Sequence, residues 1–116
     1  MKKEKDPKVF LGHILESIER IEKYLRSFSE DDFYGDIKTQ DAVIRRFQVI
    51  GEAVRHLTDG FKELHPVIVW KEMVGMRDKV VHDYFSIDLE ILWDTVQQDL
   101  PSLKTVVEKL LKQLEK

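Results

Sequence analysis

The chain has 116 residues, a formal net charge of −3 and no cysteine. Its length suits one compact domain, and we predict a single domain over residues 1–116. The lack of thiols excludes disulfides and thiolate metal sites, and the acidic balance excludes a protein that coats nucleic acid through general positive charge. Apolar residues make up 42% and charged residues of both signs 35%, which is typical of a helical protein with long solvated faces.

The first predicted helix begins at Asp6-Pro7, an N-cap residue followed by proline at the first helical position. The Ser-Glu-Asp-Asp stretch 29–32 is interpreted as its end, and Gly35 marks a break. Between them, spacings of four and three residues place one apolar face along five turns, made by Phe10, Ile14, Ile18, Ile21, Leu25 and Phe28.

A second helix is predicted from about Ile37 to Leu57, with Thr58-Asp59-Gly60 ending it. Gly51 lies inside this helix at a cost of about 1 kcal/mol relative to alanine, which suggests the close approach of another backbone. The apolar stripe of the helix consists of Val43, Phe47, Ile50, Val54 and Leu57.

A third helix is predicted from about Val67 to near His82, and Ser86-Ile87-Asp88 offers the cap of a fourth. Pro101 must either kink that fourth helix or restart it. No alternating strand pattern competes anywhere in the sequence. The predicted fold is therefore all-α, an antiparallel bundle of four to five helices.

The N-terminal residues are charged, and no apolar run follows them that would read as a signal peptide. No segment approaches the roughly 20 apolar residues that a membrane helix needs. We therefore predict a cytoplasmic protein without membrane contact.

The stretch RDKVVHDYF, residues 77–85, places charges where burial is expected. On a helical wheel Arg77 falls inside an apolar arc, between Val74 and Trp70, although an unpaired buried charge is costly. His82 lies about 140° around the helix from Arg77 and about 7.5 Å along its axis. The two side chains can converge only if the helix ends near His82, or if a second copy of the chain supplies the missing half.

An arginine paired with a histidine suits phosphodiester cleavage without a metal. Histidine can take a proton from an RNA 2′-hydroxyl or give one to the leaving oxygen, and arginine can hold the non-bridging oxygens. The two proton transfers need an acid and a base, and the motif supplies one histidine per chain. A two-fold dimer is therefore favoured on chemical grounds, because it would bring two such histidines together. The alternative is that both residues cap carbonyl groups at a helix C-terminus.

The motif Arg77-x4-His82-x-Tyr84 resembles the HepT-like toxins of the HEPN superfamily, which are encoded beside minimal nucleotidyltransferase antitoxins. The resemblance covers nearly the whole chain in the expected order. It also includes Asp41-Ala42, the stretch 49–53, Trp70, residues 85–88, Trp93, and Asp99-Leu100-Pro101 with Leu103.

This resemblance implies a homodimer in which the motifs of two subunits face a shared cleft. It implies metal-independent cleavage of tRNA or mRNA with no cofactor, with Arg77 and His82 as catalytic residues. It also implies a nucleotidyltransferase partner that, in some members, transfers AMP to the motif tyrosine, here Tyr84. Asp78 stands where many relatives carry asparagine, and as a carboxylate it could compete with phosphate for Arg77.

Two other functions fit the same residues. The chain could be a non-catalytic dimer that holds a nucleotidyltransferase, or a purely structural bundle. His13, His56 and His65 show no paired metal-ligand spacing and are interpreted as surface or packing residues. Arg45 and Arg46 are interpreted as part of a solvated face, although they are the best local candidates for a nucleic-acid contact.

Overall fold

The computed structural model describes residues 6–64 and 88–115, and these residues form helices and short connections without a strand. The all-α prediction is therefore confirmed for this part of the chain, whereas the helix predicted over 67–82 lies outside the described residues. In chain order the helices are α1 (Pro7–Tyr24), α2 (Glu30–Tyr34), α3 (Ile37–His56), α4 (Asp59–Leu64) and α6 (Leu89–Leu114).

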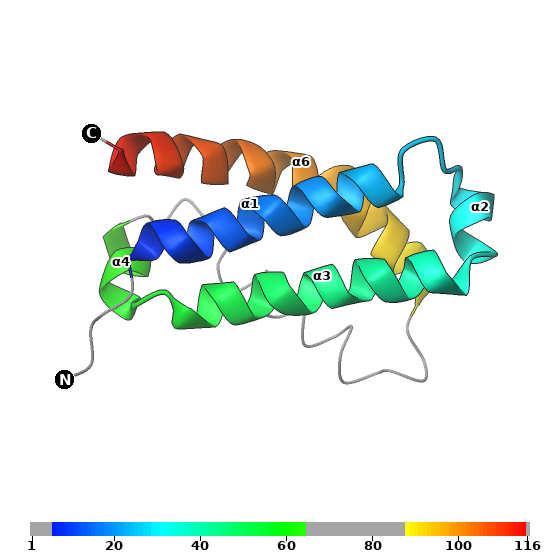
Figure 1. Cartoon of the computed structure of the whole chain (residues 1–116), viewed down its shortest axis with the longest axis horizontal. Coiled ribbons are helices and arrows are strands. Elements are labelled where there is room, and N and C mark those ends of the chain that lie inside the picture. Colours follow the sequence, from blue (N-terminus) through cyan, green and yellow to red (C-terminus); the bar gives the residue numbers. More distant parts are fainter. Residues whose placement is uncertain (1–5, 65–87, 116) are drawn as a thin grey trace.

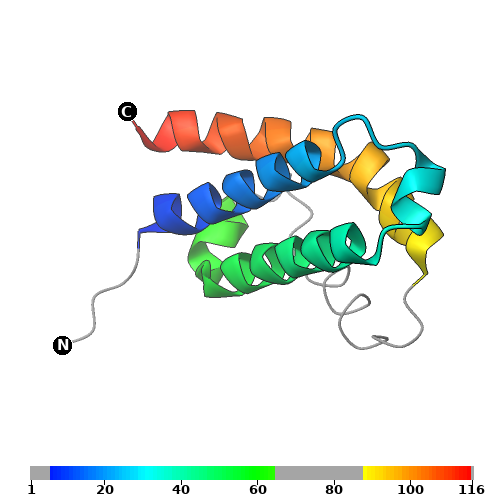
Figure 2. The ribbon, with the colours of Figure 1, turned by 45° about the vertical axis from the view of Figure 1, so that its right-hand side comes forward.

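Helix α1 lies between α3 and α6 and runs antiparallel to both (Figure 1). At one end of the bundle, α2 closes the space against the beginnings of α3 and α6, and α4 lies at the other end (Figure 2). The apolar faces of the helices meet in one core, as the helical periodicity predicts. Its most deeply buried side chains are Leu11, Ile14, Ile18, Ile21, Phe33, Val43, Phe47, Val54, Leu92 and Val107.

The start of α1 agrees with the prediction and its end does not. The Asp6 carboxylate accepts a hydrogen bond from the Lys8 backbone N–H at 2.9 Å, which satisfies one of the free amides of the first turn. The helix stops at Tyr24, one turn earlier than expected, and Ser27 then turns the chain with a φ of 71°. Phe28 still packs against the core, although it is not helical.

Residues 29–32 do more than follow the first helix, because Ser29 caps a further helix, α2, which was not predicted from the sequence. The Ser29 Oγ accepts from the Asp32 N–H at 3.1 Å, and the Asp32 carboxylate accepts from the Ser29 N–H at 3.0 Å. A helix of five residues is unstable by itself. It persists here because the side chain of Phe33 is fully buried and lies against Trp93 of α6, with 5.6 Å between ring centroids.

Helix α3 matches the predicted bounds within one residue and carries the predicted apolar stripe in the core. Asp36 caps its start by accepting a hydrogen bond from the Thr39 N–H at 3.0 Å. Gly51 is buried, and the close approach of another backbone there stays a prediction. Thr58 does more than end the helix, because its hydroxyl accepts from the Phe61 N–H at 3.1 Å and begins α4.

Helix α6 begins at the predicted cap, where the Asp88 carboxylate accepts hydrogen bonds from the N–H groups of Glu90 and Ile91. It continues through Pro101 rather than restarting there. Proline lacks the N–H that would bond the carbonyl one turn back, so the helix can bend at this point. Figure 2 shows the first turns directed toward α2 and the last turns running along α1.

The two described residues that flank segment 65–87 lie far apart in the bundle. Helix α4 lies at one end of the molecule, and α6 begins near α2 at the other (Figure 1). Among the described helices, none is both long and apolar enough to cross a membrane.

Candidate functional site

The four predicted site residues, Arg77, Asp78, His82 and Tyr84, all lie outside the described residues. Their roles and mutual geometry stay predictions.

The end of the bundle at α2 is strongly acidic. Residues 26–41 and 88–99 together contain nine acidic residues and only two basic ones, Arg26 and Lys38. Like charges at this density repel a polyanion such as RNA. The described residues of this end therefore do not favour an RNA backbone.

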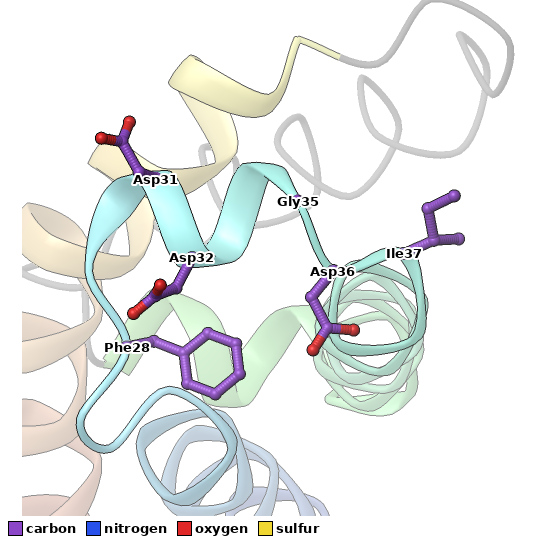
Figure 3. A pocket seen from close by; sticks show the side chains of 6 residues that line it. All are labelled: Phe28, Asp31, Asp32, Gly35, Asp36 and Ile37. Atoms are coloured by element: carbon purple, nitrogen blue, oxygen red, sulfur yellow. The ribbon is translucent and has the colours of Figure 1, made fainter.

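A groove of about 550 Å³ opens at the same end between α2 and the start of α3 (Figure 3). It is lined by Phe28, Asp31, Asp32, Gly35, Asp36 and Ile37. Figure 3 shows Asp32 and Asp36 on the side of the Phe28 ring, whereas Ile37 turns away from it.

The carboxylates of Asp32 and Asp36 are already engaged in capping α2 and α3. No cluster of three metal-ligating side chains occurs within residues 6–64 and 88–115. The groove has the charge to attract a cation but lacks a set of ligands arranged to hold one.

Tyr34 stands exposed beside this groove and carries a shifted pKa. Its hydroxyl donates a hydrogen bond to the Glu30 carboxylate. That bond raises the pKa of the Tyr34 phenol well above its ordinary value, and the nearby charges of Glu30, Glu90 and Asp94 raise it further. The phenol therefore stays protonated and acts as a donor at neutral pH.

The two described histidines behave as the sequence predicts. The His56 imidazole stacks on the Phe10 ring, with 5.2 Å between centroids and 19° between planes, which ties the end of α3 to the start of α1. His13 is exposed on α1. His65 lies outside the described residues.

One arginine departs from the sequence interpretation. Arg45 is exposed and lies near Gln48, but Arg46 is half-buried and its Nη1 donates to the hydroxyl of Ser17 on α1 at 3.4 Å. Arg46 is therefore not part of a solvated face. The burial of Arg46 could be predicted from the sequence, because Arg46 lies one turn before buried Ile50 on the same face of the helix. Its hydrogen-bond partner, 29 residues earlier in the chain, could not be predicted from any local spacing.

The helical fold and the Arg77-x4-His82 pattern together indicate a class, that of helical HEPN proteins. The Ribonuclease HepT-like family matches residues 14–110, which include both residues of the pattern. The chain belongs to this family.

Relatives of known sequence agree with the family. The chain is 50% identical over 105 residues to "Probable ribonuclease HepT" of Thermococcus cleftensis, covering 90% of this chain and 96% of that protein. It is 37% identical over 107 residues to a "Putative RNase" of Caldanaerobacter subterraneus, covering 92% of this chain and 96% of that protein.

A longer relative also matches. The chain is 46% identical over 112 residues to "Gamma-glutamylcyclotransferase and putative RNase" of Methanocaldococcus jannaschii, covering 97% of this chain. It spans only 50% of the length of that relative. No solved structure shows a significant match.

Proposed function

We propose that the chain is a metal-independent endoribonuclease that cuts tRNA or mRNA, with Arg77 and His82 as its catalytic residues. The observation that carries this proposal is the family match over residues 14–110, which contains the Arg77-x4-His82 pattern. The ribonuclease names of the relatives support the same substrate class.

In the proposed reaction the RNA 2′-oxygen attacks the adjacent phosphorus, and the bond from phosphorus to the 5′-oxygen breaks. His82 takes the proton of the 2′-hydroxyl, and a second histidine protonates the leaving 5′-oxygen. The Arg77 guanidinium stabilises the negative charge that develops on the non-bridging oxygens. The products are a 2′,3′-cyclic phosphate and a 5′-hydroxyl.

A homodimer fits this chemistry, because the partner subunit would supply the second His82. The proposed cleft is then shared, and neither subunit is active alone. Asp78, next to Arg77, would be positioned to compete with the substrate phosphate for the guanidinium.

We further propose that the chain is the toxin of a toxin–antitoxin pair and that a minimal nucleotidyltransferase neutralises it by transferring AMP to Tyr84. The Tyr84 oxygen would attack the α-phosphate of ATP, pyrophosphate would leave, and the phenolic proton would pass to solvent. The attached AMP brings a phosphodiester charge beside Arg77 and occupies the place of an RNA phosphate. Chain length alone keeps Tyr84 within roughly 14 Å of Asp88 at the start of α6.

The cleavage proposal is tested with purified protein and RNA in EDTA. Wild type is expected to release fragments ending in 2′,3′-cyclic phosphate, and His82→Ala is expected to abolish cleavage with the helix content unchanged. Arg77→Ala should lower the rate at least about 30-fold, as expected for loss of an oxyanion donor. The matched control is His13→Ala, which removes an exposed histidine from α1 and should cleave like wild type.

Cleavage by His82→Ala at the wild-type rate would overturn the assignment. The AMP proposal has its own test: incubation with the cognate nucleotidyltransferase and ATP, followed by intact-mass measurement. A gain of one AMP mass or a multiple is expected, and Tyr84→Phe should show none. An unchanged wild-type mass would contradict it.

A second candidate function is a non-catalytic dimeric module that holds the nucleotidyltransferase. The acidic surface at the α2 end favours it, because that surface repels RNA but suits a positively charged protein. This alternative predicts a tight complex with the nucleotidyltransferase and no cleavage of RNA by wild type at any protein concentration.

A further inference from the structure

We propose that Arg46 binds a backbone phosphate of the RNA substrate and that buried Ser17 positions its guanidinium for this contact. The inference rests on the proposed function, since it assumes an RNA substrate. It adds a binding site on the seam between α1 and α3, which lies within the described residues.

Ser17 is an unusual member of the inner face of α1. Its neighbours on that face, Ile14, Ile18 and Ile21, are fully buried aliphatic residues, and the Ser17 side chain is 0% exposed. A buried hydroxyl is costly unless it is hydrogen-bonded. The Arg46 Nη1 donates a hydrogen bond to this hydroxyl, so the end of the arginine side chain lies against α1.

The guanidinium of Arg46 keeps most of its donors for another partner. Arginine carries five N–H donors, and the bond to Ser17, which is long at 3.4 Å, uses one of them. Within residues 6–64 and 88–115, the ion pairs Lys8–Asp6, Arg20–Glu16 and Lys104–Glu22 leave Arg46 out, and its hydrogen bond is to a neutral hydroxyl. A half-buried guanidinium whose described partner is a neutral hydroxyl favours an anion as a further partner.

Phosphate is the anion that this geometry favours. The planar guanidinium fork matches two phosphate oxygens, and a fixed side chain loses little entropy when it binds. Arg46 also lies at the middle of α3, nine residues or roughly 13 Å from the acidic end where α3 begins. The acidic residues repel a polyanion from that end, and the repulsion is weaker at Arg46.

Arg45 provides a matched control, because it is the next residue, has the same charge and is exposed. The experiment measures the affinity for a short 2′-O-methyl RNA, which cannot be cut because its 2′-oxygen is blocked. Arg46→Gln should weaken binding about tenfold, the effect of losing a charge-assisted contact. It should also lower the slope of log affinity against log salt by about 0.7, whereas Arg45→Gln should change both far less.

Three further variants separate a phosphate contact from a general effect of charge or folding. Arg46→Lys keeps the charge but loses the fork, so it should recover the salt slope and only part of the affinity. Ser17→Ala should weaken binding without removing charge, and the double variant Ser17→Ala/Arg46→Gln should bind no worse than Arg46→Gln. Melting curves and light scattering check that each variant is folded and has the wild-type number of subunits.

Equal losses for Arg45→Gln and Arg46→Gln, with wild type binding RNA, would overturn this inference and leave the proposed function intact. A changed subunit number in Arg46→Gln would also overturn it, since the arginine would then belong to an interface between subunits. If wild type bound and cut no RNA, the proposed function itself would fail, and this inference with it.

Discussion

Phe33 of α2 packs against Trp93 of α6, with 5.6 Å between the ring centroids and 37° between the ring planes. This contact joins a helix of only five residues to the first turns of a long helix that starts directly after the segment carrying Arg77 and His82. The bundle end at α2 is therefore held by an aromatic contact as well as by backbone hydrogen bonds.

Phe33→Ala is expected to lower the free energy of unfolding by about 3–5 kcal/mol, because the side chain is fully buried and leaves a cavity. Urea denaturation followed by circular dichroism measures the change. Phe33→Leu should cost less, and Tyr34→Phe, at the exposed neighbouring residue, should cost far less than Phe33→Ala. A loss below about 1 kcal/mol for Phe33→Ala would show that α2 does not depend on this contact.

Ser27→Gly is expected to raise the free energy of unfolding by up to about 1 kcal/mol. Ser27 has a φ of 71°, a conformation that costs L-residues about 1–2 kcal/mol and glycine nearly nothing. The greater freedom of glycine in the unfolded chain offsets part of the gain. Ser27→Ala, which keeps the Cβ atom, serves as the control and should give no gain in the same denaturation assay.

Gly12→Ala is expected to stabilise the chain by about 0.5–1 kcal/mol through the higher helix propensity of alanine. Gly12 lies inside α1, and a Cβ atom built there meets no described neighbour within 4 Å. The midpoint of thermal unfolding should rise accordingly. A fall in stability would show that a group outside the described residues, or a second subunit, packs on this position.

Tyr34 is expected to titrate at a higher pH than an ordinary tyrosine, because ionisation would break its bond to Glu30 and place a negative charge near Glu90 and Asp94. The difference in phenolate absorbance between wild type and Tyr34→Phe isolates its titration from the other tyrosines. Glu30→Gln should move the pKa of Tyr34 back toward the ordinary value near 10.

The raised pKa of Tyr34 also predicts that the folded chain loses stability at high pH. A raised pKa in the folded state means that the folded chain holds the proton more tightly than the unfolded chain. The stability that the protonated Tyr34 phenol contributes is therefore fully present below about pH 10. It is lost as the pH rises toward the raised pKa of Tyr34. Wild type should lose more stability than Tyr34→Phe across that alkaline range, and parallel losses would contradict the assignment.

Helix starts could be predicted from the sequence because their causes are local. Asp6 and Asp88 each accept a hydrogen bond from an amide two residues ahead, so the capping residue and its partner lie within one short stretch of sequence. The capping box at Ser29 and Asp32 is equally local, but it does not by itself predict α2, because a five-residue helix needs Phe33 buried against another element.

The apolar spacing of the sequence by itself determined an all-helical fold and the residues of its core, since the 3.6-residue period puts those side chains on one face whatever they meet. Only the tertiary structure decided which helices meet and which polar groups pair between them. Ser17 and Arg46 are 29 residues apart, and Glu22 and Lys104 are 82 apart. Such pairs depend on how two helices lie against each other, and no local spacing encodes that arrangement.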